Sequence, residues 1–314
     1  MNELKVFSGN AHPGQAKAVA DYLKIPLGNC EVFEFSNENI FVRILDNVRE
    51  RDTFIIQPIC SPVNKNLVEL LIMIDALKRA SAGRITAVMA QYAYGRSDRK
   101  DQPRIPITAR LVADLLTAAG ANRVLTVDLH SAQIQGFFNI PVDELTALYI
   151  LSDYFEKRKL QDMVVVAADF GISKRARDVA ARLNAPLAII EQRRVDNADN
   201  KEALNIIGDV KGKAALIFDD EITTGGTLTN VVSVILERGA REVYACATHP
   251  VFSGPAIERI AASPVKEVVV TDTVPIPAEK KLDKITVLPM APLLGEAISR
   301  IHSGQSIGAL FNNR

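Results

Sequence analysis

The chain has 314 residues, 48% of them apolar, which is enough material for one large domain or two of ordinary size. Its 37 Lys and Arg residues balance its 37 Asp and Glu residues, so the composition argues against a surface specialised for nucleic acid or acidic membranes. Its three cysteines are scattered and form no CxxC pair, which argues against a disulfide framework or a zinc site.

The amino-terminal residues MNELKVFSGN reach a polar turn at once and contain no stretch of signal-peptide length. No later run approaches the roughly 20 apolar residues that cross a bilayer. We therefore expect a soluble, cytoplasmic protein that has neither a membrane nor a nucleic acid as its partner.

Short β-rich runs recur along the chain, with helical patterns between them. In the two clearest helical patterns, residues 66–80 and 107–120, apolar residues recur at helical spacing. Strands made of continuous apolar residues are typical of parallel sheets covered on both faces. The predicted fold class is therefore α/β, with mostly parallel sheets flanked by helices. The predicted strands are residues 4–7, 53–57, 85–90, 123–129, 163–168, 214–218, 243–248, 267–272 and 284–289.

Residues 118–130 and 237–249 align without a gap, each with the pattern of a helix, a Gly, a strand and a His. Gly-Ala before a strand is common in α/β proteins, and the alternative is two domains of one fold arranged in tandem. Because both halves of the chain contain sheet patterns, we predict two domains, at residues 1–146 and 147–314.

Residues 214–239 carry the strongest chemical signal. A buried strand is predicted to end in Asp219 and Asp220, and a loop rich in Gly and Thr then leads into an apolar helix. Backbone N–H groups, threonine hydroxyls and the positive start of a helix together bind a phosphate monoester. Paired carboxylates can accept hydrogen bonds from vicinal hydroxyls, so the segment indicates a sugar phosphate; a glycine-rich turn with acidic caps is the alternative. The loop residues are Thr223, Thr224, Gly225, Gly226 and Thr227.

This pattern resembles the phosphoribosyl-binding loop shared by type I phosphoribosyltransferases and the pyrophosphokinases that make their substrate. The segment QYAYGRSDRKDQPRIPITAR (91–110), which taken alone is typical of a solvated charged face, resembles the catalytic flexible loop of ribose-phosphate pyrophosphokinases. TVDLHSAQIQGFFNIPVD (126–143) closely matches another motif of that family. Further similar stretches extend the resemblance over essentially the whole chain: FSGNAHP (7–13), NVRERDTFIIQ (47–57), ELLIMIDALKRASA (69–82) and THPVFSGPA (248–256).

The resemblance is to the phosphate-activated, ADP-inhibited class of this family, and it implies two tandem phosphoribosyltransferase-type domains. The implied reaction transfers diphosphate from Mg-ATP to the anomeric hydroxyl of ribose 5-phosphate, which gives phosphoribosyl pyrophosphate and AMP for nucleotide biosynthesis. The implied cofactor is Mg²⁺. Phosphate and ADP are expected to regulate the enzyme, and a homo-oligomer is expected, namely a hexamer built from dimers.

The resemblance also assigns residues to ATP. Phe35 is expected to stack on the adenine ring, and Asn37 and Asn39 are expected to contact its edge. The alternating pattern around Phe35 equally allows a core aromatic residue, so both interpretations stay open. Arg96 and Ser97, in the flexible loop, are expected to bind the nucleotide as well.

For the metal, the resemblance implies His130 in VDLH and Asp169 in VVVAADFGISKRARDVA (164–180). Mg²⁺ prefers oxygen ligands, so the contact of His130 is expected to be partly through water. Asp169, the turn at Gly171 and the cations that open the next helix resemble the family's pyrophosphate loop. The residues expected to act on the transferred group are Arg99, Lys174, Gln192 and Arg194.

Some site residues depart from the family pattern. Gln192 stands where the family usually has a Lys, Thr223 replaces an Asp, and Asn39 replaces a Glu. Phe170 and Ile172 replace small residues beside the pyrophosphate loop. Loss of one charged stabiliser can lower the rate of phosphoryl transfer by roughly two to three orders of magnitude.

These departures leave three interpretations open: an active synthase in which other cations compensate, a weakly active or silent regulatory paralogue, or a pyrophosphokinase with a different acceptor. A phosphoribosyltransferase that consumes the product is a further competitor, and it predicts a nucleobase-binding hood without ATP dependence. The retained residues that favour activity on ribose 5-phosphate are Asp219, Asp220, Arg96, Arg99, His130 and Asp169.

Overall fold

The computed structural model describes residues 3–194 and 201–311, and the chain folds into two compact units. The first unit comprises Met1–Thr146, Thr273–Pro275 and Met290–Arg314, and the second comprises Ala147–Asp272 and Ile276–Pro289. The last helix of the chain therefore belongs to the first unit, although the sequence places it in the second of the two expected domains. The chain leaves and re-enters the first unit twice.

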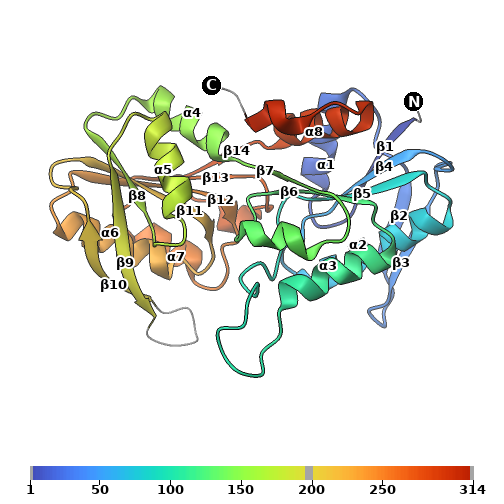
Figure 1. Ribbon diagram of the computed structural model, residues 1–314, viewed down its shortest axis with the longest axis horizontal. Helices are drawn as coiled ribbons and strands as arrows, with labels where there is room; N and C mark the ends of the chain where they lie inside the picture. Colours follow the sequence, from blue (N-terminus) through green and yellow to red (C-terminus); the bar gives the residue numbers. More distant parts are fainter. Residues whose placement is uncertain (1–2, 195–200, 312–314) are drawn as a thin grey trace. The chain divides into compact units, whose positions relative to one another are not determined.

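The first unit is built on a five-stranded sheet of order β1-β4-β5-β6-β7, in which all neighbouring pairs are parallel. Helices α1 and α8 lie on one face of this sheet and α2 and α3 lie on the other (Figure 1). Every residue of β4 is buried, as expected for a central strand covered on both faces. The elements are β1 (Leu4–Ser8), β4 (Asp52–Ile56), β5 (Arg84–Met89), β6 (Arg123–Val127), β7 (Val142–Leu145), α1 (Pro13–Leu23), α2 (Val63–Arg79), α3 (Thr108–Ala119), α8 (Ala291–Ser303), η1 (Ala132–Phe137) and η3 (Ile307–Phe311).

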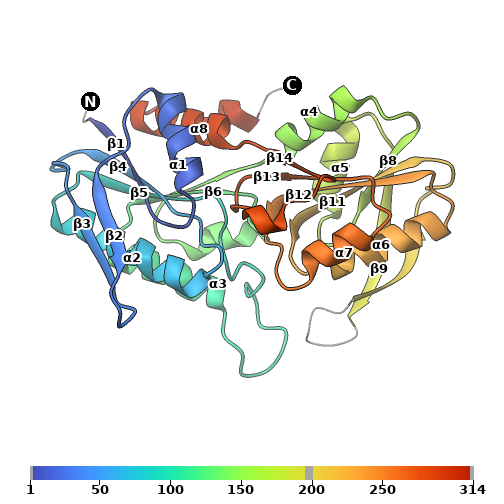
Figure 2. The ribbon, with the colours of Figure 1, turned by 180° about the vertical axis from the view of Figure 1, so that it is seen from behind.

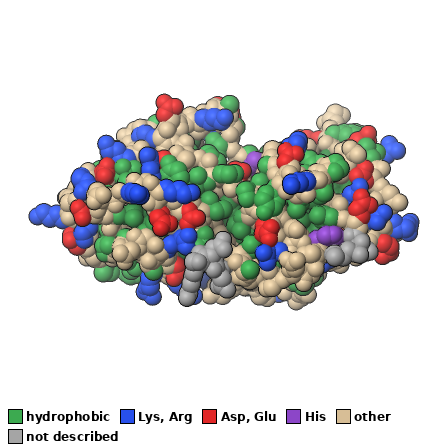
Figure 3. Space-filling view, turned by 90° about the horizontal axis from the view of Figure 1, so that it is seen from above, with side chains coloured by type: hydrophobic (Ala, Val, Ile, Leu, Met, Phe, Trp, Pro, Cys, Tyr) green, Lys and Arg blue, Asp and Glu red, His purple; other side chains and the backbone are tan. Residues whose placement is uncertain are grey.

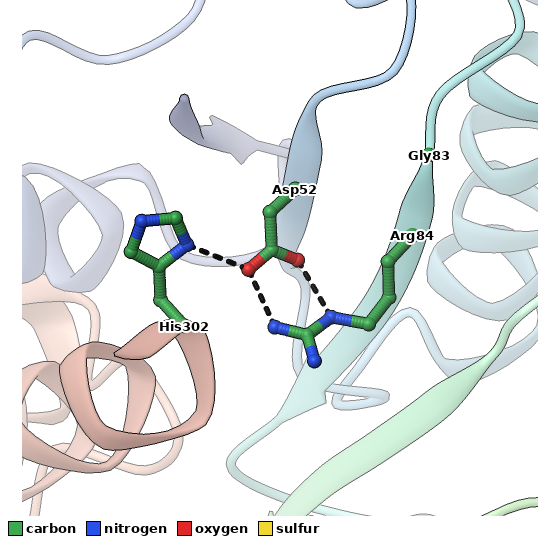
Figure 4. Close-up of a pocket in the computed structure, with 4 residues that line it drawn as sticks. All are labelled: Asp52, Gly83, Arg84 and His302. Carbon is green, nitrogen blue, oxygen red and sulfur yellow. Dashed lines mark hydrogen bonds and ion pairs between the residues drawn. The ribbon is translucent and has the colours of Figure 1, made fainter. Parts of the chain in front are cut away.

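Helix α8 is held in the first unit by close packing and by an ion-pair cluster. A Cβ at Gly295 would lie 2.3 Å from the ring of Tyr22 on α1, so a glycine is needed at this crossing. Arg84 donates two hydrogen bonds to the Asp52 carboxylate, at 2.7 and 2.5 Å, and His302 Nδ1 lies 2.8 Å from the same group (Figure 4). The Arg84 guanidinium also donates to the carbonyl of Ile301, so α8 is fixed to the amino ends of β4 and β5.

A separate two-stranded antiparallel hairpin projects from the first unit and packs on α2. It consists of β2 (Cys30–Glu34) and β3 (Ile40–Ile44). An ion pair at 2.5 Å between Lys65 of α2 and Glu34 of the hairpin adds to this packing.

The second unit contains a seven-stranded sheet of order β10-β9-β8-β11-β12-β13-β14, which is parallel except for the pair β10 and β9. Helices α4 and α5 lie on one face, and α6 and α7 lie on the other (Figure 2). The elements are β8 (Met163–Ala167), β9 (Leu187–Arg194), β10 (Lys201–Ile207), β11 (Ala214–Ile222), β12 (Glu242–Pro250), β13 (Glu267–Thr271), β14 (Ile285–Leu288), α4 (Leu148–Arg158), α5 (Ser173–Arg182), α6 (Gly226–Glu237), α7 (Ala256–Ala262) and η2 (Ala278–Lys280).

The predicted fold class is confirmed, since both sheets are mostly parallel and flanked by helices. All nine predicted strands are present. The repeated pattern of helix, glycine and strand also occurs once in each unit, with Gly120 at φ 120° before β6 and Gly239 at φ 86° before β12. The nine predicted strands do not include β2, β3, β7, β9 and β10; of these, β7 and β10 lie at sheet edges, and β2 and β3 form a separate hairpin.

The surface agrees with the balanced composition of the chain. Lys and Arg side chains are interspersed with Asp and Glu side chains over the face seen in Figure 3. Within residues 3–194 and 201–311, no helix combines the length and the apolar character needed to cross a bilayer.

A buried carboxylate, Glu267, links α4 to the amino ends of β13 and β14. It accepts hydrogen bonds from Tyr154 Oη at 2.5 Å, Arg158 Nη2 at 2.6 Å and Thr286 Oγ1 at 2.7 Å. Burial alone would raise the pKa of Glu267, but the hydrogen bonds from these three residues outweigh it and hold the pKa below its ordinary value. The ionised form of Glu267 therefore stabilises the fold.

We expect Glu267→Gln to lower the free energy of unfolding at pH 7 by about 1–3 kcal/mol, because it removes a charged hydrogen-bond acceptor from a buried network. A carboxyl whose pKa is lowered by folding stabilises the protein above its ordinary pKa of 4.5 and loses this effect as the pH falls through the folded value. The difference between the variant and the parent should thus shrink below pH 4.5. Urea unfolding followed by circular dichroism at several pH values checks this.

Glu279→Gln, at an exposed position of the same unit, is the matched control and should leave the unfolding midpoint unchanged. Equal effects of the two substitutions at pH 7 would contradict the stabilising role of Glu267.

Candidate active site

Strand β11 carries the predicted sugar-phosphate residues past the end of its neighbour β8. It pairs with β8 only as far as Phe218 opposite Ala167, whereas its pairing with β12 continues to Ile222. Asp219 and Asp220 therefore lie inside β11, beyond the β8 ladder, rather than at the end of the strand as the sequence suggested. This carboxyl edge of a parallel sheet is where open α/β folds place their ligands.

Three carboxylates come together at this edge. Asp219 is partly exposed, Asp220 is buried, and Asp169 follows the end of β8. Burial, the charge of Asp220 and the charge of Asp169 together raise the pKa of Asp219 well above its ordinary value. The amide of Asp220 donates to Asp219 Oδ1 and the amide of Glu221 donates to Asp220 Oδ1, each at 2.9 Å. The site thus concentrates negative charge that a cation or hydroxyl donors would stabilise.

The glycine-rich loop leads from β11 into α6. Gly225 has φ 72°, and a Cβ there would lie 3.3 Å from the carbonyl oxygen of Ala256, so glycine suits both the conformation and the space. A Cβ at Gly226 would lie 3.1 Å from Arg259 Nη1. No side chain caps the start of α6, so the first N–H groups of the helix remain available to an anion. Thr223, Thr224 and Thr227 are half-buried around this helix start.

Asp169 lies on the turn that joins β8 to α5, and Lys174 lies in the first turn of that helix. Asp169 Oδ1 accepts a hydrogen bond of 3.2 Å from the amide of Ile172, which shapes the turn. Lys174 is exposed in the first turn of α5. Phe170 and Ile172, which replace small residues of the family pattern, differ in environment: Phe170 is 54% exposed, whereas Ile172 is buried in the unit. Only Phe170 is therefore placed to change what a ligand would meet.

Gln192 and Arg194 lie on β9, in the part of the strand that continues past β8 and pairs with β10. Gln192 is opposite Ala203 and Arg194 is opposite Lys201. Their side chains lie outside the described residues, so their expected roles stay predictions.

The residues expected at adenine occupy the turn of the β2–β3 hairpin. Phe35 is 49% exposed, which argues against the interpretation of a core aromatic residue. Its ring lies 5.2 Å from Phe33 and 5.9 Å from Phe41, so the hairpin presents an aromatic surface. The amide of Asn39 donates to Asn37 Oδ1 at 3.2 Å, which fixes the turn.

The charged loop leads from β5 into α3 (Figure 1). Arg96 and Arg99 are exposed on it. Ser97 has a role that the sequence did not reveal, because its Oγ accepts from the amide of Thr108 at 3.2 Å and its carbonyl accepts from Ala109 at 3.1 Å. Ser97 thus accepts hydrogen bonds from the first two amides of α3, which have no partner within the helix.

His130 is exposed just after β6, and the start of the charged loop passes beside it. A Cβ at Gly95 would lie 3.3 Å from His130 Cβ. The first unit therefore brings the beginning of the loop and His130 together. Within the described parts of the chain, no group of three or more His, Cys, Asp and Glu residues is arranged to hold a metal ion.

The cavity drawn in Figure 4 is lined by none of the residues predicted to bind ATP or ribose 5-phosphate. It has a volume of about 270 Å³ and is lined by Asp52, Gly83, Arg84 and His302. It lies at the amino ends of β4 and β5, the edge of the first unit's sheet opposite the ends that lead to the charged loop.

Known proteins resemble this chain over its whole length. Family models described as the N-terminal domain of ribose phosphate pyrophosphokinase and as the phosphoribosyl synthetase-associated domain match residues 4–120 and 194–312. A ribose-phosphate pyrophosphokinase of Caldanaerobacter subterraneus subsp. tengcongensis is 57% identical over 99% of this chain and 98% of the relative. One from Oceanobacillus iheyensis is 52% identical over the same shares.

Among solved structures, phosphoribosylpyrophosphate synthetase from Mycobacterium smegmatis superimposes with a TM-score of 0.92 at 44% identity, covering 96% of this chain and 100% of that chain. These similarities confirm the expected fold class and enzyme class. The chain belongs to the ribose-phosphate pyrophosphokinase family.

Proposed function

We propose that this protein transfers the diphosphate group of ATP to the anomeric hydroxyl of ribose 5-phosphate, which gives phosphoribosyl pyrophosphate and AMP. The observation that carries the proposal is the edge of the second unit, where a carboxylate pair precedes a glycine loop at an uncapped helix start. Family membership over the whole chain supports the same reaction.

Ribose 5-phosphate fits the chemistry of this edge. The N–H groups at the start of α6 and the hydroxyls of Thr223, Thr224 and Thr227 would bind the 5-phosphate. Asp219 and Asp220 would accept hydrogen bonds from the two vicinal ring hydroxyls. Such bonds are charge-assisted and therefore strong, and they stabilise the ionised carboxylates against their mutual repulsion.

ATP would use residues of the first unit. Phe35 offers an exposed ring for stacking on adenine, with Asn37 and Asn39 in the same turn. Arg96 and Arg99 are exposed cations on the loop and would pair with the phosphates. Ser97 holds the loop to α3, so its contribution to nucleotide binding would come through the position of Arg96.

Mg²⁺ fits the residues that are present. Mg²⁺ commonly keeps several waters and binds one or two protein carboxylates together with substrate phosphates, so a complete protein cage is not needed. In the second unit, Asp169 would supply a carboxylate to an ion beside Asp219 and Asp220; in the first unit, His130 would contact the Mg²⁺ of ATP through a bound water. When bound, the ion would spread the negative charge of the transferring phosphates.

The reaction needs no covalent intermediate with the protein. The anomeric oxygen forms a bond to the β-phosphorus, the bond from that phosphorus to the oxygen bridging the α-phosphate breaks, and AMP leaves with that oxygen. The hydroxyl proton passes to solvent. The protein positions the reactants and stabilises charge, with Arg99, Lys174 and Arg194 as cations near the transferred group. Gln192 would contribute a hydrogen bond in place of the family's lysine.

Further parts of the proposal rest on the family alone. Phosphate and ADP would regulate the enzyme, and the chain would form a homohexamer and work in the cytoplasm. Each of these remains a prediction for this chain.

The assay of AMP formation tests the proposed function. Purified protein with ATP, Mg²⁺, phosphate and ribose 5-phosphate should release AMP in equal amount to the sugar consumed, and a chelator should stop the release. Binding without turnover would favour the regulatory paralogue. AMP release only with another sugar phosphate would favour a different acceptor, and turnover without ATP would favour a transferase.

Asp220→Asn should weaken binding of ribose 5-phosphate about 10- to 100-fold and leave the affinity for ATP almost unchanged, because the diol loses a charged acceptor. The same variant should unfold at a higher temperature at pH 7. The charge of Asp220 raises the pKa of Asp219, and a carboxyl with a raised pKa opposes folding once it ionises. Calorimetric binding and thermal unfolding check the two effects.

Asp283→Asn, at an exposed carboxylate of the same unit, is the control and should change neither quantity. A loss of affinity for ATP as large as that for ribose 5-phosphate would remove the role assigned to Asp220.

The charged loop should act as a lid. We expect proteases to cleave residues 94–104 readily in the free protein and slowly with Mg-ATP bound. Arg99→Ala should lower kcat about 10- to 1,000-fold, because a charge that stabilises the transferring group is lost, while circular dichroism stays unchanged. Lys281→Ala, at an exposed position of the second unit, is the control. Unchanged turnover in Arg99→Ala would assign the loop to a solvated charged surface.

A further inference from the structure

The phosphate loop of the second unit is braced from outside by residues 252–259, which connect β12 to α7 and form its first turn. Three successive carbonyls, those of the last residue of β11 and of the first two loop residues, accept hydrogen bonds from this segment. The amide of Phe252 donates to Ile222 O at 3.0 Å, and the amide of Ser253 donates to Thr223 O at 2.9 Å. Arg259 Nη1 donates to Thr224 O at 3.0 Å. The third bond is the one made by a side chain.

These bonds fix the direction of the loop amides. In a planar trans peptide, the carbonyl of one residue and the N–H of the next point in opposite directions. Because each carbonyl is turned toward residues 252–259, the N–H groups of Thr223, Thr224 and Gly225 are turned away from that segment. This orientation presents successive N–H groups for an anion, in line with the start of α6.

The bracing segment is itself fixed. Phe252 is buried in the core of the unit, and its carbonyl accepts a hydrogen bond of 2.8 Å from Lys280 Nζ. Ala256 and Ile260, on α7, are fully buried. Arg259, by contrast, is exposed, so its guanidinium would move freely in solvent without its acceptor on Thr224. It lies against the loop, within 3.1 Å of the position that a Cβ at Gly226 would occupy.

We propose that Arg259 is a positioning residue for ribose 5-phosphate: by holding the carbonyl of Thr224, it orients the N–H of Gly225 toward the 5-phosphate. Its positive charge beside the start of α6 also favours the dianion. This inference rests on the proposed function, because it assigns the 5-phosphate to the same loop. It adds a residue 35 positions away from Thr224 in the sequence.

Arg259→Ala should raise the KM for ribose 5-phosphate about tenfold and leave the KM for ATP within about twofold, because the misoriented loop binds the 5-phosphate less well. Arg259→Lys keeps a charged donor and should recover most of this affinity. A merely structural role would instead change kcat, both KM values and thermal stability together.

Arg241→Ala is the matched control. Arg241 is also exposed and also donates to main-chain carbonyls, those of Gly212 at 3.1 Å and Gln161 at 2.7 Å, but it lies at the amino end of β12. Its removal should leave both KM values unchanged. Parallel calorimetry of ribose 5-phosphate, without ATP, measures binding apart from turnover.

The inference is supported if Arg259→Ala weakens the binding of ribose 5-phosphate and Arg241→Ala does not. This holds even if the parent forms no AMP and the proposed function fails. A parent that forms AMP, with equal KM for ribose 5-phosphate in parent and Arg259→Ala, would overturn the inference and leave the function standing. If Arg259→Ala does not fold, Arg259→Lys takes its place. An equal rise in the KM for ATP and the KM for ribose 5-phosphate in Arg259→Lys would overturn the inference.

Discussion

The repulsion of the Asp219 carboxylate by Asp220 and Asp169 is the constraint on the candidate ligand edge of the second unit. Like charges held this close, and partly removed from water, raise the pKa of Asp219 and oppose folding. A flexible segment would relax by moving the carboxylates apart. Here two of them lie on β11, which is fixed by its ladder to β12, so the charge stays concentrated until ligands compensate it. Stability elsewhere in the unit, such as the Glu267 network, offsets this strain.

The central elements were predictable because burial leaves a strong pattern in a sequence. The five residues of β4 are all buried, and three of them, Phe54–Ile56, form a short apolar run that marks a covered strand. The strands of the hairpin contain no buried residue: β2 reads CEVFE and β3 reads IFVRI, and all their residues are partly or fully exposed. Helix α8 could not be assigned to the first unit, because its partners Asp52 and Arg84 are more than 200 residues away in the chain.

The candidate site likewise contains residues that could be predicted from the sequence and residues that could not. The residues from Asp219 to Thr227 are contiguous, so residue type and order alone predicted a phosphate loop, and the structure places them at one sheet edge. The bracing by Phe252, Ser253 and Arg259 could not be predicted, because two of its three bonds use backbone amides that no residue type marks. Ser97 is a similar case, since its capping of α3 joins residues on either side of a loop.

The assignment of α8 to the first unit has a consequence for synthesis on the ribosome. The strands of that unit emerge early, but the helix that covers one face of α1 is translated after the whole second unit. Helix α8 later buries its own residues Ile298 and Ile301 against the first unit. Until α8 has been translated, the apolar surface that it covers stays exposed on the nascent chain. The second unit therefore has all its strands available for pairing before the last helix of the first unit is translated.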